Sequence, residues 1–390
     1  MSNTKVAVSH TTLCLPDAAG RAVAEAILQK LDAERPDVLI IFASPEFDFQ
    51  SLLNAVDTAC RPRLLVGCSS AGEFSGCATG NASVSAMAIR SDDILFQAGL
   101  GTGLRDDPRS AIEQILPVFS GERHPDFPYR NALVLTDALA GYVDEIIHGM
   151  MVATGGTYQL FGGGAADDAK FHRTHVFLGT EAYTDAIVVL EMLSKKPIGL
   201  GVRHGWKPVG PALRVTEARG KRLVSLNAAP AVEVFEEHAQ ATNQTFNRAD
   251  PLPFFLHNVI GIDTGDGYKL RVPLSLDEDG SISCAAEIPV GATVRIMAAD
   301  QTSACQAARE ASQAALEGLQ GGQHAGSLLF DCAATRLRLG RQFEDELEAV
   351  ATTLGSENFA GCNTYGQIAR SSGQFSGFHN CTAIVCAIPL

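Results

Sequence analysis

The sequence predicts a mixed α/β fold, with repeated β-α-β-β units that form mixed sheets and an antiparallel β-rich region in the middle of the chain. Two observations predict it. Three segments share one order of apolar strand, amphipathic helix, Gly-rich turn and final strand. The stretch between the second and third segments consists instead of short strand patterns joined by Gly and Asp turns. The length of 390 residues suits two or three domains.

The first repeat opens with DVLIIFAS at 37–44, an apolar run of buried-strand length. An amphipathic helix is expected at 49–59, a strand that runs into a Gly-rich turn at 63–76, and a further strand at 81–89. About 30 residues separate the first strand from the turn, which suits a crossover helix and a second strand parallel to the first.

The other two repeats keep this order. The second repeat is expected as a strand at 131–139, a helix at 143–154, a strand with its Gly-rich turn at 158–168 and a final strand at 185–193. The third repeat is expected as a strand at 327–335, a helix at 341–353, a strand with its Gly-rich turn at 358–369 and a final strand at 380–388. One unit cannot bury both faces of so small a sheet, so the three copies are expected to pack against one another.

The region 198–299 is expected to be antiparallel sheet, with Asp279-Gly280 as a hairpin signal. Two helices are expected to interrupt this sheet, at 230–238 and 302–318, and a linker or inserted loop is expected at 239–253.

Composition excludes some partners. The net charge is -14 and no run of Lys or Arg offsets it, so nucleic acid and membrane surfaces are not expected as partners. No signal-peptide pattern and no apolar stretch of 18 residues occur, which favours a cytoplasmic location. The ten cysteines form no CxxC pair, so most are expected to be free buried thiols, and zinc is disfavoured.

Five phrases together resemble the FIST family of bacterial sensory proteins. They are GCSSAGEFSG (67–76), FGGGAADDAKFHRTHVFLG (161–179), GLGVRHGWKPVGPALRVTEARG (199–220), DGSISCAAEIPVGATVRIM (279–297) and GCNTYGQIARSSGQFSGFHNCTAIV (361–385). The resemblance implies an N-terminal-type sensory region at 1–225, which holds two repeats, and a C-terminal-type region at 226–390, which holds the β-rich part and the third repeat.

The resemblance also implies a role in signal transduction, in which the chain senses a small ligand and acts in trans on a histidine kinase or a cyclic-nucleotide signalling enzyme. A subset that resembles the NosP proteins binds haem and senses nitric oxide. The family pattern commonly reads Gly-Glu-Ile in the last phrase, whereas this chain has Gln367 at the acidic position, which puts any role of that acid in doubt here.

The Gly-rich turns are the expected ligand site, because glycine lets backbone N–H groups face a ligand closely. We expect the three turns to gather around one shared cavity; the alternative is that these glycines, including Gly361, only allow tight packing. The candidate ligand-binding residues are Gly67, Cys68, Ser69, Ser70, Gly72, Glu73, Gly162, Gly163, Gly164, Asp167, Asp168, Cys362, Asn363, Thr364, Gly366, Gln367, His379 and Asn380.

Carboxylates near these turns favour an amino-acid-like ligand, whose ammonium group Asp167, Asp168 and Glu73 could bind while backbone N–H groups bind its carboxylate. Alternatively, the aspartates fix the turn by bonds to its backbone. A nucleotide is not expected, since the turns match neither GxGxxG nor a P-loop.

Two further functions remain open. A haem-based nitric oxide sensor would need an axial ligand, for which His379, His172 and His175 are the candidates. A thiol-dependent enzyme would need an activated cysteine, and Cys68 and Cys362 occupy matching turn positions. The second repeat has Gly163 there, which favours a structural need for a small residue. No catalytic motif such as GxSxG or HExxH occurs, so we expect a non-catalytic protein.

Overall fold

The computed structural model describes residues 4–80, 82–370 and 376–390. Asn81, the first residue of the strand expected at 81–89, and residues 371–375, within the last family phrase, lie outside the described residues. Inside the described ranges, no helix combines the length and the apolar character that crossing a bilayer requires. The mixed α/β class is confirmed, with parallel pairs in three sheets and an antiparallel fourth sheet.

Each repeat is longer than the sequence pattern indicated, because a strand and a helix precede the predicted elements. The first repeat is β1 (Lys5–Thr11), α1 (Pro16–Lys30), β2 (Val38–Ala43), α2 (Phe49–Cys60), β3 (Leu64–Ser69), β4 (Glu73–Ser75), β5 (Ala78–Gly80) and β6 (Val84–Arg90). The second is β7 (Ile94–Thr102), α3 (Pro108–Ile115), β8 (Tyr129–Asp137), α4 (Val143–Ala153), β9 (Gln159–Ala165), β10 (Val176–Leu178), β11 (Glu181–Tyr183) and β12 (Ala186–Ser194), with 3-10 turns η1 (Leu116–Val118) and η2 (Gly121–Arg123).

The third repeat follows the same plan. It consists of β13 (Gly199–Arg203), α7 (Gln301–Gly318), β23 (His324–Cys332), α8 (Ala333–Leu339), η3 (Gly340–Gln342), α9 (Phe343–Leu354), β24 (Phe359–Thr364), β25 (Gln367–Arg370), β26 (Ser376–His379) and β27 (Ala383–Pro389). In each repeat the two strands that flank the crossover are parallel, as predicted, and the last strand returns antiparallel to the first of them.

The three repeats exchange hairpins. The β4–β5 hairpin of the first repeat pairs with β24 of the third, β10–β11 of the second pairs with β3 of the first, and β25–β26 of the third pairs with β9 of the second. Every repeat therefore completes the sheet of another repeat, and the three sheets close into a ring. We call this ring, with its helices, the three-repeat body.

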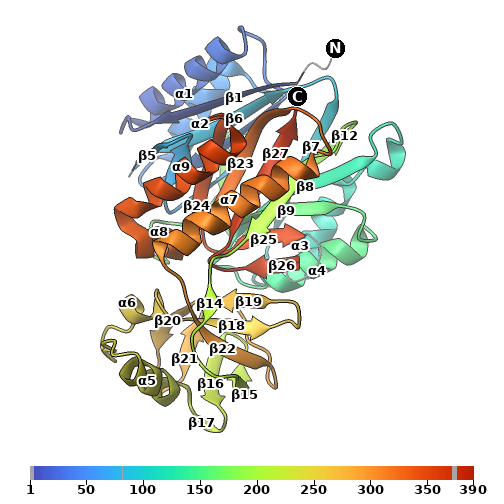
Figure 1. Ribbon diagram of the computed structural model, residues 1–390. Helices are drawn as coiled ribbons and strands as arrows, with labels where there is room; N and C mark the ends of the chain where they lie inside the picture. Colours follow the sequence, from blue (N-terminus) through green and yellow to red (C-terminus); the bar gives the residue numbers. More distant parts are fainter. Residues whose placement is uncertain (1–3, 81, 371–375) are drawn as a thin grey trace.

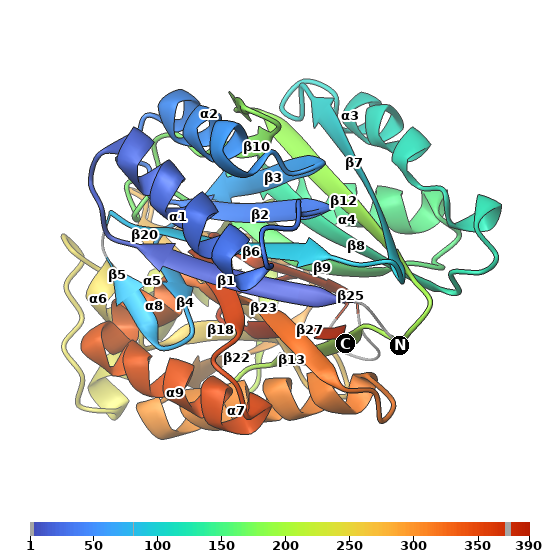
Figure 2. The ribbon, with the colours of Figure 1, turned by 90° about the horizontal axis from the view of Figure 1, so that it is seen from above.

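The core of the three-repeat body lies between the inner faces of its sheets. Phe330 packs on Phe42 and Phe161, one aromatic ring from each repeat, with centroids 5.6 and 6.5 Å apart. Helices cover the outside of the ring in pairs: α1 with α2, α3 with α4, and α7 with α9 (Figure 2). The copies thus bury one another's sheets, which is why one unit would not suffice.

The β-rich middle region forms one antiparallel sheet below the three-repeat body (Figure 1). We call it the inserted sheet, since it enters the chain between β13 and α7. Its elements are β14 (Lys207–Pro208), β15 (Leu213–Arg219), β16 (Arg222–Leu226), β17 (Ala229–Pro230), α5 (Ala231–Ala241), α6 (Leu252–Phe255), β18 (Val259–Asp263), β19 (Tyr268–Arg271), β20 (Pro273–Leu276), β21 (Ile282–Cys284) and β22 (Thr293–Ala298). The expected division at 225/226 falls within β16, and it stays a prediction about sequence regions.

Candidate functional site

The three Gly-rich turns meet at one end of the ring, where the parallel strands finish. Each pair of turns shares a backbone N–H···O bond of 2.9 Å: Ala71 to Asn363, Ala166 to Ser69, and Gly164 to Gly366. These N–H groups are therefore already bonded to a neighbouring turn.

Equivalent glycines explain how closely the strands approach. A Cβ on Gly67, Gly162 or Gly361 would lie about 2 Å from a main-chain oxygen of the neighbouring parallel strand, as the distances of 1.9, 2.1 and 1.9 Å show. No side chain fits in such a space. At these three positions the structure shows tight packing, which was the alternative to ligand contact.

Glu73 lies in a closed cradle in the first turn. Its side chain is buried, and its carboxyl oxygens accept hydrogen bonds from the Ser70 hydroxyl and, at 2.7 Å, from the Ser83 hydroxyl. Burial raises the pKa of Glu73 to about 7, although the two serine bonds act in the opposite direction. Near neutral pH this side chain is therefore protonated in a substantial share of the molecules.

Gln367 lies in the corresponding cradle of the third repeat. Its Nε2 donates to Thr364 Oγ1 at 2.9 Å, and its Oε1 accepts from the Thr382 backbone N–H at 3.3 Å. In both turns the hydroxyl residue precedes the acid or amide by three positions, since Thr364 precedes Gln367 as Ser70 precedes Glu73. The amide at the family's acidic position thus makes the hydrogen bonds that hold the turn, and it carries no charge.

Asp167 anchors the second turn. Its carboxylate accepts the backbone N–H groups of Phe171, His172 and Arg173 at 2.7–2.8 Å, and also the Tyr365 hydroxyl. These bonds hold a short loop in which three side-chain-bearing residues adopt left-handed backbone, with φ of 53–58° at Asp168, Ala169 and Phe171. Asp167 therefore fixes the loop, and its oxygens are occupied.

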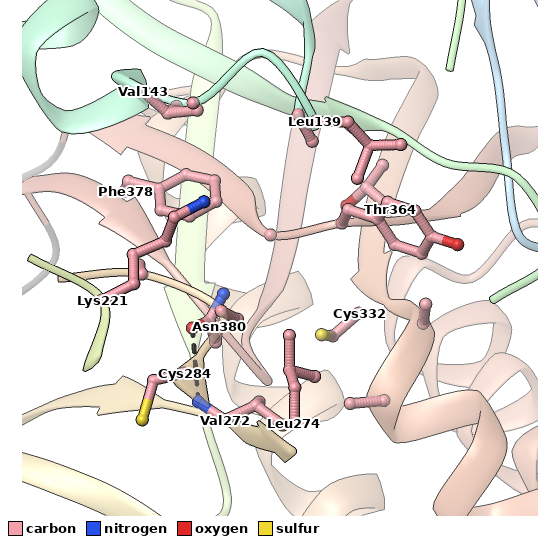
Figure 3. Close-up of a pocket in the computed structure, with 18 of the residues that line it drawn as sticks. Leu139, Val143, Lys221, Val272, Leu274, Cys284, Cys332, Thr364, Phe378 and Asn380 are labelled. Atoms are coloured by element: carbon pink, nitrogen blue, oxygen red, sulfur yellow. Dashed lines mark hydrogen bonds between the residues drawn. The ribbon is translucent and has the colours of Figure 1, made fainter. Parts of the chain in front are cut away.

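One cavity, which we call the main cavity because its walls are largely apolar, lies beside the turns, between the three-repeat body and the inserted sheet. It holds about 250 Å³. Figure 3 shows Leu139, Val143 and Phe378 of the body on one side and Val272 and Leu274 of the inserted sheet on the other. Its lining includes Ala138, Ala333 and Tyr365, which directly follow the parallel strands β8, β23 and β24.

The predicted site residues divide into three groups. Thr364, Gly366 and Asn380 line the main cavity. Gly72 and Asp168 line a second, more open cavity of about 730 Å³ beside Arg336. The others lie behind these walls, in the packed turns and core: Gly67, Cys68, Ser69, Ser70, Glu73, Gly162, Gly163, Gly164, Asp167, Cys362, Asn363, Gln367 and His379.

Charged residues of the main cavity were missed by the sequence reasoning. Lys221, Glu145 and Glu287 are exposed at its rim, and in the described part of the chain no protein group bonds to the Lys221 ammonium. Asp144 instead pairs with Lys269 at 3.0 Å and Arg271 at 3.1 Å, which ties α4 to the inserted sheet. No local motif marks these residues, because they come from segments far apart in sequence.

Aromatic rings form one edge of the opening. Phe171, which the Asp167 loop presents, stacks on Tyr365 with centroids 4.6 Å apart and planes inclined by 10°. The Phe171 ring is 44% exposed, so it offers an apolar face to solvent at the rim.

The histidines proposed for haem lie elsewhere. Among the described residues, no histidine lines the main cavity. His379 is buried at the end of β26, His172 is exposed in the Asp167 loop, and His175 packs edge-on against Phe49 with centroids 5.0 Å apart. Within the described residues, the main cavity therefore offers haem no histidine as an axial ligand.

The thiols proposed for catalysis are fully buried. Cys68 and Cys362 lie in the central core between the sheets, and neither lines a described cavity. Burial, together with the neighbouring Cys68, raises the pKa of Cys362 well above its usual range. A nucleophilic cysteine needs the opposite shift.

Family models account for most of the chain. The FIST N domain model matches residues 37–229, and the FIST C domain model matches residues 231–370. No curated protein matches.

Two solved structures illustrate more distant likeness. A cyanuric acid hydrolase from A. caulinodans is 9% identical over 100% of both chains, with a TM-score of 0.37. T. maritima PurL complexed with ADP is 10% identical over 99% of this chain and 71% of that chain, with a TM-score of 0.24. Scores below 0.5 assign neither a fold nor an activity.

Proposed function

Because the chain belongs to the FIST family, whose domains are small-ligand sensory modules in signal transduction, we propose that it binds an amino-acid-like metabolite in the main cavity without transforming it. One observation carries the proposal. The cavity combines apolar walls with opposite charges at its rim, where Lys221 accompanies Glu145 and Glu287.

This arrangement matches the parts of an apolar amino acid. The Lys221 ammonium would bind the ligand carboxylate, and a rim carboxylate would bind the ligand ammonium. The ligand side chain would lie against Leu139, Val143 and Phe378. A volume of about 250 Å³ is slightly below the range of roughly 300–1,000 Å³ for drug-sized ligands, which favours a small metabolite.

A two-state response is proposed from the position of the cavity. Its walls belong to two units, so a ligand that touches both stabilises one relative placement of them. The ion pairs of Asp144 with Lys269 and Arg271 cross the same junction. We propose that this placement is read by a histidine kinase or a cyclic-nucleotide signalling enzyme acting in trans.

Calorimetric titration of the purified protein with a panel of amino acids tests the proposal. We expect binding of apolar amino acids, with an affinity at least 10-fold lower in Lys221→Met, because a charge-assisted hydrogen bond contributes about 1.5–3 kcal/mol. Lys207→Met is the matched control, since Lys207 is also exposed on the inserted sheet but does not line the main cavity. Absence of heat across the panel, or equal affinities in the two variants, would contradict the proposal.

The haem alternative is tested on the same protein. Because no described histidine lines the main cavity, we expect the absorption spectrum of added haem to show no Soret shift. A shift that disappears in His379→Ala would establish the alternative instead.

A further inference from the structure

Two thiols meet at the wall of the main cavity. Cys332, the last residue of β23, lines this cavity and is only 4% exposed (Figure 3). Cys381, which precedes β27, lies behind it and is 5% exposed. The two side chains pack in the same buried cluster, together with Trp206, and each shifts the pKa of the other. Neither thiol takes part in the ligand contacts proposed above.

The surroundings make the two thiols unequal. Hydrogen bonds from the Cys381 thiol, the Cys381 N–H and the Ala334 N–H outweigh burial and lower the pKa of Cys332 to about 7. The same contact, together with burial, raises the pKa of Cys381 well above its usual range. Near pH 7, about half of the Cys332 side chains are thus thiolate while Cys381 keeps its proton, which is the arrangement of a nucleophile beside a resolving thiol.

We propose that Cys332 is a modification site, whose sulfur reacts with a small hydroperoxide that enters the main cavity and whose product Cys381 converts into a disulfide. The Cys332 sulfur attacks one peroxide oxygen, an S–O bond forms, the O–O bond breaks, and hydroxide leaves. Cys381 then attacks the Cys332 sulfur, an S–S bond forms, and water leaves with the Cys381 proton. The hydroxide takes up the proton that Cys332 lost on ionisation. Two thiols thus lose two electrons in total, and one hydrogen peroxide becomes two waters.

A second thiol pair in the same chain provides the comparison. Cys68 and Cys362 also belong to one cluster, but both are fully buried in the central core. No described cavity reaches them, and the raised pKa of Cys362 disfavours its thiolate. Access and thiolate character therefore distinguish the cavity pair from the core pair.

The test treats the purified full chain with one equivalent of hydrogen peroxide and maps the products by peptide mass spectrometry. We expect a peptide pair linked through Cys332 and Cys381 that is two hydrogen masses lighter than its reduced form. In Cys381→Ser, dimedone should trap a sulfenic acid on Cys332, and in Cys332→Ser neither product should form. A link between Cys68 and Cys362, or oxidation of exposed Cys77 while Cys332 stays reduced, would overturn the proposal.

The pH dependence of cysteine alkylation in the unaltered protein tests the proposal without any substitution. Alkylation of Cys332 by iodoacetamide should reach half its maximal rate near pH 7, whereas the rate at Cys77, whose pKa burial raises, should still increase above pH 9. Identical profiles would refute the assignment. The outcome is separate from the proposed function, because it requires no ligand and leaves the amino-acid titration unaffected.

Discussion

The buried carboxyl of Glu73 should make the stability of this protein depend on pH, and Glu73→Gln should remove that dependence. The pKa of this group rises from 4.5 to about 7 on folding, chiefly because of burial. The folded state therefore holds its proton to a higher pH than the unfolded state does. The resulting stabilisation is fully present below pH 4.5 and is lost as the pH rises through about 7.

The magnitude follows from the same shift. At about 1.4 kcal/mol per pH unit, the whole effect is roughly 3 kcal/mol, of which about 2.5 kcal/mol falls between pH 5 and pH 8. Glutamine remains neutral throughout and can bond to the same hydroxyls, as Gln367 does to Thr364. Glu73→Gln should therefore be about 2.5 kcal/mol more stable, relative to the unaltered protein, at pH 8 than at pH 5.

Urea unfolding followed by circular dichroism at pH 5, 6, 7 and 8 measures this difference. Gln367→Glu is the matched reciprocal, because it places a carboxyl in the corresponding cradle and should destabilise the protein at pH 8 more than at pH 5. Parallel pH profiles for Glu73→Gln and the unaltered protein would refute the assigned protonation of Glu73.

Three further substitutions probe the turns and the junction. Asp167→Ala leaves three backbone N–H groups and a tyrosine hydroxyl without their acceptor. It should lower the free energy of unfolding by about 3 kcal/mol and speed amide exchange at 171–173. Asp168→Ala, the control, loses one bond to Ser44 and should lower the free energy of unfolding by under about 1 kcal/mol. Gly366→Ala would place a Cβ 2.0 Å from the Phe378 ring at a φ of +86°, and it should lower both the melting temperature and any ligand affinity; an unchanged melting temperature would contradict the packing. Asp144→Asn leaves the buried Arg271 guanidinium without its carboxylate and should cost about 2 kcal/mol or more in urea unfolding, with Glu145→Gln as the neutral control.

Local patterns were sufficient for much of the fold. Alternating and continuous apolar runs, such as those at 37–44 and 131–139, correspond to β2 and β8. The crossover distance correctly indicated parallel pairing. The helix expected at 302–318 is α7, although it belongs to the third repeat and does not interrupt the inserted sheet.

Local sequence patterns did not predict the hairpin exchange. Nothing in the β4 residues indicates that their partner is β24, almost 300 residues away in the chain. The main cavity was hidden for the same reason, since its walls come from the body and from the inserted sheet. Several predicted site residues, among them Asp167 and Glu73, are bonded within the turns. The sequence could not distinguish this use from ligand binding, because the same polar side chains serve both.

The amino-acid sequence by itself determined the repeated units, the β-rich insertion and the family, because these depend on local periodicity and on short phrases that neighbouring residues carry. Only the tertiary structure decided which turns touch, where the hollow lies, and that Cys332 faces it beside Cys381. The physical reason is that burial, hydrogen-bond partners and pKa values are properties of groups brought together from distant parts of the chain, and no local pattern encodes them.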